Sequence, residues 1–230
     1  MGMSGWDVIA NFMNVLKIEG RRAAIYRGQP DEKWTLVPSA YRDGVRGIVS
    51  DEQLHHWTRE AARFASPMPV DPIEWLILAQ HYGVPTNMLD WTTSPLVALF
   101  FACDDPNQKS ADGCVWRMMR SDFFEAHDTS TIHAFGDSAG PTRQKPFLVN
   151  AIGRNARSTA QEGLLTLHTP HDYQTLNARK IFTVEAQMKY DVLQCMEKLG
   201  FTSYRLYNDI GKFVECFQSQ MAGQRFPGWP

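Results

Sequence analysis

Residues 79–102 read AQHYGVPTNMLDWTTSPLVALFFA. Within them, residues 94–102 are apolar except for Ser94, and this pattern predicts a helix that Ser94 caps and Pro95 begins. A helix that is apolar on all sides is typical of a protein core. Earlier in the segment, Gly83 ends a preceding helix and Pro85 keeps the chain extended. The segment therefore places polar residues between two helices, one of which is buried.

Several polar side chains lie in the middle of this segment, among them His81 and Asp90. Buried polar groups must find hydrogen-bond partners or serve a ligand, and both interpretations remain open for these two residues. The hydroxyls of Thr92, Thr93 and Ser94 come at the positive N-terminal end of the buried helix, which suits a phosphate or a ribose. Simple helix capping is the alternative for them.

Two shorter motifs carry chemistry of their own. The apolar run 23–26 ends in Arg27 and Gly28, which predicts a strand that opens into a turn. A guanidinium there can bind a phosphate with two parallel hydrogen bonds, and Gly28 lets a ligand approach; the alternative is an arginine in a surface turn. Residues 158–163 read STAQEG, and Glu162 stands at the entrance of a strand, where it either faces a ligand or is solvated.

The remaining patterns predict mostly helices in the first half of the chain and short strands in the second. The predicted helices cover 4–18, 51–65, 71–82, 94–102, 189–199 and 208–220. The predicted strands cover 23–26, 36–38, 115–119, 163–168, 180–184 and 203–207. A long loop is predicted for 128–145. Because strands and helices do not alternate, a doubly wound parallel sheet is not expected. The sequence favours one α+β domain over residues 1–230.

Composition narrows the class of protein. A net charge of −2 over 230 residues argues against a protein held to nucleic acid by bulk electrostatics, although a local basic groove remains possible. The four cysteines form no CxxC pair, and no HxxxH or HExxH spacing occurs, so no metal is expected. There is no apolar run of membrane-spanning length and no secretion signal at the start, so we expect a cytoplasmic protein without membrane contact.

These motifs together resemble the FRG domain, a family associated with bacteria and phages and named for an aromatic-Arg-Gly motif. Tyr26-Arg27-Gly28 matches that motif, and residues 36–42 match a Leu-Pro-Ser…Arg element. Residues 79–102 are similar to the most specific part of the family, and 161–164 match its Gln-Gln/Glu-Gly-hydrophobic segment. Asn87 stands where the family commonly has arginine, and 107–145 look like a variable insertion.

FRG domains in turn resemble NAD-dependent ADP-ribosyltransferases. This resemblance implies a split antiparallel β-sandwich flanked by helices, with NAD as substrate. It implies that Arg27 and Glu162 are catalytic, Glu162 by stabilising the positive charge on the ribose. The cofactor-binding residues that it implies are Arg27, Gly28, Tyr82, Thr92, Thr93, Ser94 and Gln161.

The resemblance also implies a biological role as a toxin or phage-defence effector. Nucleic acid, with RNA slightly favoured, or a protein would accept the ADP-ribose, and an antitoxin protein would neutralise the enzyme. Trp57, Trp75, Trp91 and Trp116 could stack on bases, and the core is their other possible place. A non-catalytic module that binds nucleotides or nucleic acid and an NAD glycohydrolase are the alternative functions.

Overall fold

A computed structural model describes residues 2–19, 23–126, 129, 132–136, 145–151, 156–170, 172 and 176–221. Its centre is a seven-stranded sheet with the order β4-β5-β6-β2-β1-β3-β7. Strands β4 and β5 run parallel, and the other neighbours are antiparallel. The strands are β1 (Ala24–Gln29), β2 (Met88–Thr92), β3 (Gly113–Met119), β4 (Phe124–Ala126), β5 (Phe147–Asn150), β6 (Gly163–Leu167) and β7 (Arg179–Val184).

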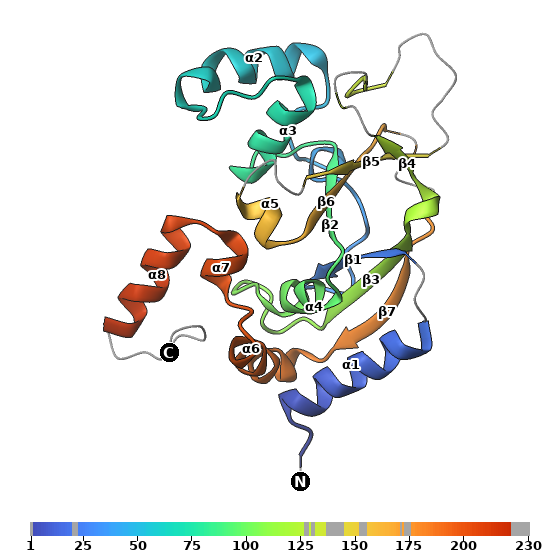
Figure 1. Cartoon of the computed structure of the whole chain (residues 1–230), viewed down its shortest axis with the longest axis vertical. Helices are drawn as coiled ribbons and strands as arrows, with labels where there is room; N and C mark the ends of the chain where they lie inside the picture. The colour runs from blue at the N-terminus through green and yellow to red at the C-terminus, as the bar shows by residue number, and fades with distance from the viewer. Residues whose placement is uncertain are drawn as a thin grey trace.

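The helices lie at both ends of the sheet and across its middle (Figure 1). They are α1 (Gly5–Glu19), α2 (Asp51–Ala61), α3 (Pro72–His81), α4 (Pro95–Cys103), α5 (Ala156–Ala160), α6 (Lys189–Lys198), α7 (Ser203–Tyr207) and α8 (Ile210–Met221). Short 3-10 helices cover Ser39–Tyr41, Ala62–Phe64, Arg120–Asp122 and Ala186–Met188. The mixed α+β architecture is confirmed, and the strands form one open sheet.

Helix α4 crosses β1 at very short range because Gly28 has no side chain. A Cβ atom at Gly28 would lie 1.9 Å from the carbonyl oxygen of Ala98 and 2.6 Å from the backbone nitrogen of Ala102. As the sequence predicts, Ser94 caps this helix and Pro95 begins it. Helices α1 and α6 pack around α4 to complete one hydrophobic core.

The opposite face of β1 carries a different core. Ile25 packs there with Leu89 and Trp91 of β2 and with Leu164 of β6. Successive side chains of a strand alternate between the two faces of a sheet. Arg27, two residues after Ile25, therefore lies on this second face, while Gly28 faces α4.

Strands β1 and β2 meet at a single register pair, Tyr26 opposite Thr92, and then diverge. By contrast, β1 pairs with β3 along its whole length, and β2 pairs likewise with β6. The sheet is thus two well-paired halves joined at one point. We call the space between the diverging strands the wedge; it opens from Tyr26 and Thr92 toward Gln29 and Met88.

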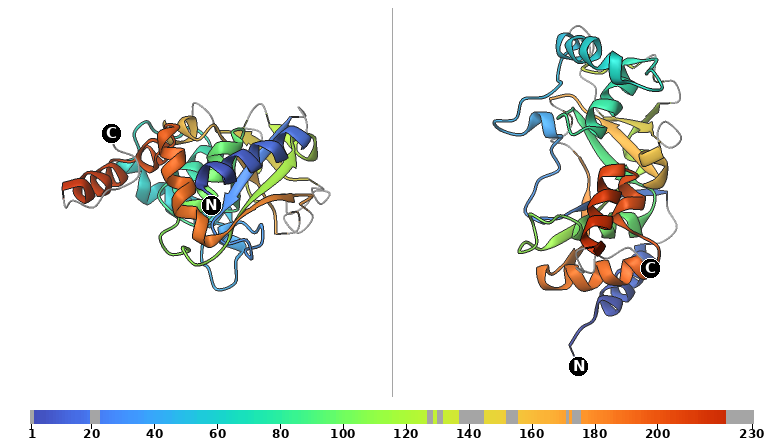
Figure 2. Two further views of the ribbon diagram at one scale, coloured as in Figure 1. Left: turned by 90° about the horizontal axis from the view of Figure 1, so that it is seen from below. Right: turned by 90° about the vertical axis from the view of Figure 1, so that its left-hand side faces the viewer.

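The segment after β1 returns across the wide end of the wedge. Residues 35–42, which we call the strap, leave the end of β1 and pass the start of β2 (Figure 2, right). The Gln29 side chain donates to the carbonyl of Thr35 at 3.4 Å, and the Ala40 amide donates to the carbonyl of Thr86 at 3.1 Å. The strap is therefore bound to the end of β1 and to the segment just before β2.

Several sequence predictions differ from the structure. Residues 203–207 form helix α7 and not a strand, and 36–38 belong to the strap, outside any strand. The sequence analysis missed strands β2, β4 and β5 and helix α5. Of the predicted loop 128–145, only 129, 132–136 and 145 lie among the described residues.

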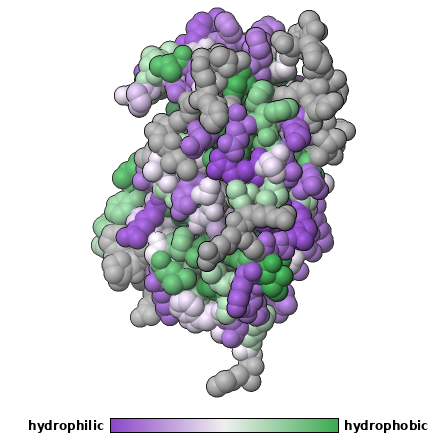
Figure 3. All heavy atoms as spheres, turned by 45° about the vertical axis from the view of Figure 1, so that its right-hand side comes forward, coloured by the Kyte–Doolittle hydropathy of each residue, from purple (hydrophilic) through white to green (hydrophobic). Residues whose placement is uncertain are grey.

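Hydrophilic side chains dominate the middle of the face shown in Figure 3, and hydrophobic ones gather in its lower part.

Across the part of the chain that the structure describes, no helix combines the length and the apolar character needed to cross a membrane.

Candidate functional site

Arg27 lies in the wedge between β1 and β2. Its Nη1 donates a hydrogen bond of 2.7 Å to the carbonyl oxygen of Asp90 and lies 3.8 Å from the carboxylate of the same residue. Its Nε is buried and has no hydrogen-bond partner among the described residues. Burial lowers the pKa of Arg27, the Asp90 charge raises it, and the nearby Arg42 charge lowers it further.

Asp90 connects this arginine to helix α3. Its carboxylate accepts a hydrogen bond of 2.6 Å from the Gln80 amide, and the Gln80 carbonyl oxygen accepts one of 2.5 Å from the Thr86 hydroxyl. The carboxylate itself is 62% exposed, so it can still meet a ligand. Sequence reasoning missed Gln80; a polar residue near the end of an otherwise apolar helix is the signal that could have found it.

The hydroxyls of Thr92 and Ser94 form hydrogen bonds with the protein backbone. Thr92 is buried; its hydroxyl donates to the carbonyl of Gln161 at 2.7 Å and accepts from the amide of Ser94 at 3.0 Å. The Ser94 hydroxyl accepts from the amide of Val97 at 3.5 Å, as an N-cap does. Capping thus accounts for Ser94, and Thr92 ties the end of β2 to the turn before β6.

Thr93 is bound to the carboxylate of Glu162. Its hydroxyl donates a hydrogen bond of 2.9 Å to that carboxylate, and its amide donates to the carbonyl of Glu162 at 3.2 Å. Glu162 is exposed and has a φ of 47°, in the left-handed region that side-chain-bearing residues seldom adopt. Backbone strain of this kind concentrates at functional sites.

Arg27, Thr93 and Glu162 each stand next to a residue of one row across the sheet. That row is Tyr26, Thr92 and Gly163; Thr93 directly follows β2, and Glu162 directly precedes β6. Two strand spacings and two residue steps separate the Cα atoms of Arg27 and Glu162, about 12 Å in all. That distance suits the two ends of a dinucleotide rather than a single small group.

Residues 22–111 match the family model of the FRG domain. This part of the chain is similar to the FRG domain. Arg27, Asp90 and Thr93 lie inside the matched region of the FRG domain, whereas Glu162 lies beyond its end. No curated protein and no solved structure shows a significant match to the chain.

Two residues of the matched region have structural roles: Gly28, which was predicted to contact the ligand, and Asn87, which stands where the sequence departs from the family pattern. The close approach that Gly28 permits is that of α4, whose backbone fills the space where a Cβ would stand. Asn87 is fully buried, and its amide donates to the carbonyls of Ala134 and His168 at 2.7 and 2.9 Å. The Asn87 side chain therefore connects the backbone of two segments that are distant in the sequence.

Tyr82 and Gln161 lie on the side of the sheet that α3 and α5 cover. Tyr82 follows the last turn of α3, is 69% exposed, and packs edge-on against His81. Gln161 lines a cavity of about 50 Å³ with Gln80, Asp90 and other residues, and its Nε2 is buried without a partner in the described part of the chain. Gln161 directly precedes Glu162, in the turn that the Thr92 hydroxyl binds.

A buried chain of polar contacts starts at Trp91 of β2. The Trp91 ring donates to the Thr166 hydroxyl at 2.9 Å, that hydroxyl lies 2.7 Å from Nε2 of His168, and Nδ1 of His168 lies 3.1 Å from Asp172. Because the Trp91 N–H can only donate, the Thr166 hydroxyl accepts from it. Thr166, His168 and Asp172 are all buried, so this chain of polar contacts is enclosed in the core.

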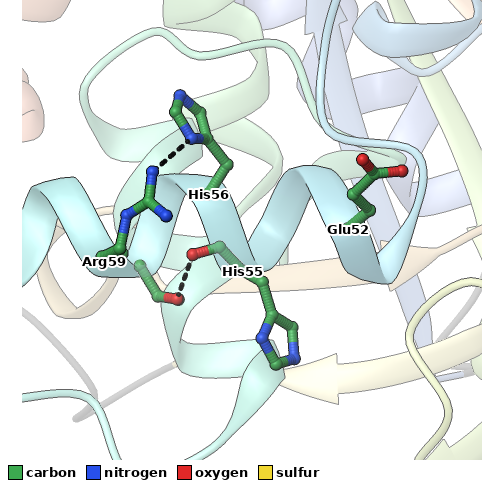
Figure 4. Close-up of a pocket in the computed structure, with 5 residues that line it drawn as sticks. Glu52, His55, His56 and Arg59 are labelled. Atoms are coloured by element: carbon green, nitrogen blue, oxygen red, sulfur yellow. Dashed lines mark hydrogen bonds between the residues drawn. The ribbon is translucent and has the colours of Figure 1, made fainter.

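A broad open depression lies on α2, lined by Glu52, His55, His56, Thr58 and Arg59 (Figure 4). All of these residues come from one helix, and both histidines are exposed. Nη2 of Arg59 lies 3.2 Å from Nδ1 of His56, a contact at the surface of the helix. Among the described residues, no group of three or more potential ligands is arranged to hold a metal ion.

Proposed function

We propose that this chain is an NAD-dependent ADP-ribosyltransferase. The observation that carries the proposal is that Arg27, Thr93 and Glu162 stand beside one row of the neighbouring strands β1, β2 and β6, where Thr93 bonds to Glu162. The resemblance assigns these positions to the pyrophosphate, the ribose and the reacting carbon. The hydrogen bond from Thr93 supports the assignment because it orients the carboxylate of an exposed residue toward β2.

In the proposed reaction the bond between C1′ of the ribose and the nicotinamide nitrogen breaks. Its electron pair goes to the nicotinamide, which leaves as a neutral ring, and C1′ acquires oxocarbenium character as in glycoside cleavage. The Glu162 carboxylate stabilises this charge and orients the nucleophile of the acceptor. The nucleophile then bonds to C1′ and releases its proton to Glu162 or to water.

The other residues have supporting roles in this proposal. Arg27 presents a buried, unpartnered donor for the diphosphate, and Thr93 holds Glu162 in place. Thr92 and Ser94 shape the turn through their backbone contacts. The exposed ring of Tyr82 is available to stack on the nicotinamide.

For the acceptor we propose nucleic acid, with RNA slightly ahead of DNA and a protein side chain next. Trp91 is 3% exposed, so it cannot stack on a base, and Trp57, Trp75 and Trp116 pack against hydrophobic cores. The association of the family with phage defence supports a toxin or defence effector that works in the cytoplasm with a neutralising antitoxin protein.

The test uses NAD labelled in its adenylate half. Purified protein is incubated with this NAD and cellular RNA, DNA and protein, and the fractions are then separated. Label on one fraction would support the proposal and name the acceptor. Free ADP-ribose would instead indicate an NAD glycohydrolase, and intact NAD would refute catalysis and favour a binding module.

Two matched variants sharpen this test. Glu162→Gln removes the charge at the proposed reaction centre, and transfer should fall on the order of 100-fold or more. Glu60→Gln removes an equal charge from the exposed surface of α2, where Glu60 contacts Arg59, and should leave transfer unchanged. Equal losses in both variants would contradict a catalytic role for Glu162.

A further inference from the structure

The strap brings a second arginine to the wedge. Its first residues are bound to the end of β1 through Thr35, and its later residues are bound to Thr86 and, through the Tyr41 hydroxyl, to the carbonyl of His168 at 3.1 Å. Arg42 is the last residue of the strap. This path spans the wide end of the space in which the Arg27 guanidinium lies.

Arg42 is held by one bond to the strap itself. Its Nε donates to the carbonyl of Val37 at 3.3 Å, and Arg42 forms no ion pair within the described residues. The outer nitrogens of its guanidinium are the pair that a phosphate or carboxylate binds side by side. The charge of Arg42 is close enough to Arg27 to disfavour the charged form of that residue.

The positive charge of the wedge exceeds its negative charge. Asp90 is the carboxylate that acts on Arg27, and its oxygen lies 3.8 Å away with 62% of the side chain exposed. Burying a guanidinium beside a like charge, with one N–H unpartnered, is costly unless an anion compensates. The arrangement therefore has a place for an anion that contacts both arginines.

We propose that Arg42 and Arg27 form a two-arginine clamp for the diphosphate of the dinucleotide. The proposal rests on the proposed function for the identity of the ligand, and it adds Arg42 as a residue that binds substrate. Each guanidinium takes one phosphate group, and the strap carries Arg42 to the ligand. The clamp favours a diphosphate over a nucleoside, which offers no charge to the two guanidinium groups.

The experiment measures binding of inorganic pyrophosphate and of ADP-ribose by isothermal titration calorimetry at low salt. In Arg42→Gln the dissociation constants for both probes should rise about tenfold or more, because a hydrogen bond to a charged group is lost. Arg42→Lys keeps the positive charge but lacks the planar guanidinium that binds two oxygens side by side. It should show a smaller loss of affinity than Arg42→Gln. Adenosine, which has no phosphate, should show no dependence on residue 42.

Arg46→Gln is the matched control. Arg46 is exposed, carries the same charge and follows the strap in the same loop. The affinities of Arg46→Gln for both probes should stay within about twofold of the unsubstituted protein, since an exposed charge without a direct contact to the ligand contributes little. An Arg42→Gln protein that bound both probes as tightly as the control would overturn the clamp.

NAD turnover separates failure of the clamp from failure of the proposed function. Turnover by Arg42→Gln with an unchanged KM would overturn the clamp and leave the proposed function intact. Arginine-dependent binding of pyrophosphate without any NAD turnover would support the clamp and overturn the proposed activity. An unsubstituted protein that binds neither probe would overturn the clamp, and the labelled-NAD assay would decide the activity separately.

Discussion

Replacing Glu162 with glycine should separate the stability of the protein from its activity. Glycine adopts the observed φ of 47° freely, which releases about 1–2 kcal/mol of left-handed strain. Against this, glycine loses about 0.5–1 kcal/mol more backbone entropy on folding. The lost hydrogen bond from Thr93 contributes about 0.5–1 kcal/mol. The free energy of unfolding should therefore change by less than about 1 kcal/mol, while transfer falls on the order of 100-fold or more.

Urea unfolding and labelled-NAD turnover measure the two quantities on the same preparation. Asn208→Gly is the matched control, because Asn208 has a φ of 46° at the C-terminal end of α7, outside the proposed site. It should change stability as little as Glu162→Gly does and leave turnover intact. A loss of more than about 2 kcal/mol in Glu162→Gly would show that this side chain supports the fold, since most single substitutions outside a core cost less. Undiminished turnover would refute its catalytic role.

Three further predictions concern the interior. Gly28→Ala should lower the free energy of unfolding by about 3 kcal/mol or more, because the new Cβ would clash with the backbone of α4. Urea unfolding measures this change, and a loss under about 1 kcal/mol would contradict the prediction. Thr166→Val should cost about 2–4 kcal/mol in the same assay, since the ring nitrogens of Trp91 and His168 lose their shared partner. Burial raises the pKa of Cys103 to about 12, so a thiol reagent at pH 8 should label it in denaturant and leave it unmodified in the folded protein.

The helices of the core were predictable because their signals are local. Ser94 and Pro95 mark the start of α4, and Asp71 with Pro72 marks α3 in the same way. Strand β2 was missed because it is buried on both faces apart from Asp90, so its sequence MLDWT does not alternate. Residues 203–207 were assigned wrongly because aromatic residues favour strands, whereas tertiary contacts make this segment a helix.

The site was predictable in its chemical groups but not in their partners. Arg27, the hydroxyl turn and Glu162 each stand out by residue type, and strand pairing places them beside one row of the sheet. The bonds from Thr92 to Gln161 and from Arg27 to Asp90 join residues more than sixty positions apart. Such contacts depend on the register between strands, which no local pattern reveals. The position of Arg42 depends in the same way on the path of the strap.

Arg27 also completes the sheet at the point where β1 and β2 separate. Beyond the pair of Tyr26 with Thr92, the carbonyl of Asp90 faces β1 without a ladder partner, and the Arg27 guanidinium donates to it instead. This bond links β1 and β2 across the wedge and so stabilises it. A substitution at Arg27 would therefore weaken the fold together with the proposed ligand binding. Glu162 and Arg42, whose side-chain hydrogen bonds to Thr93 and Val37 are exposed, are the positions at which function can be tested apart from folding.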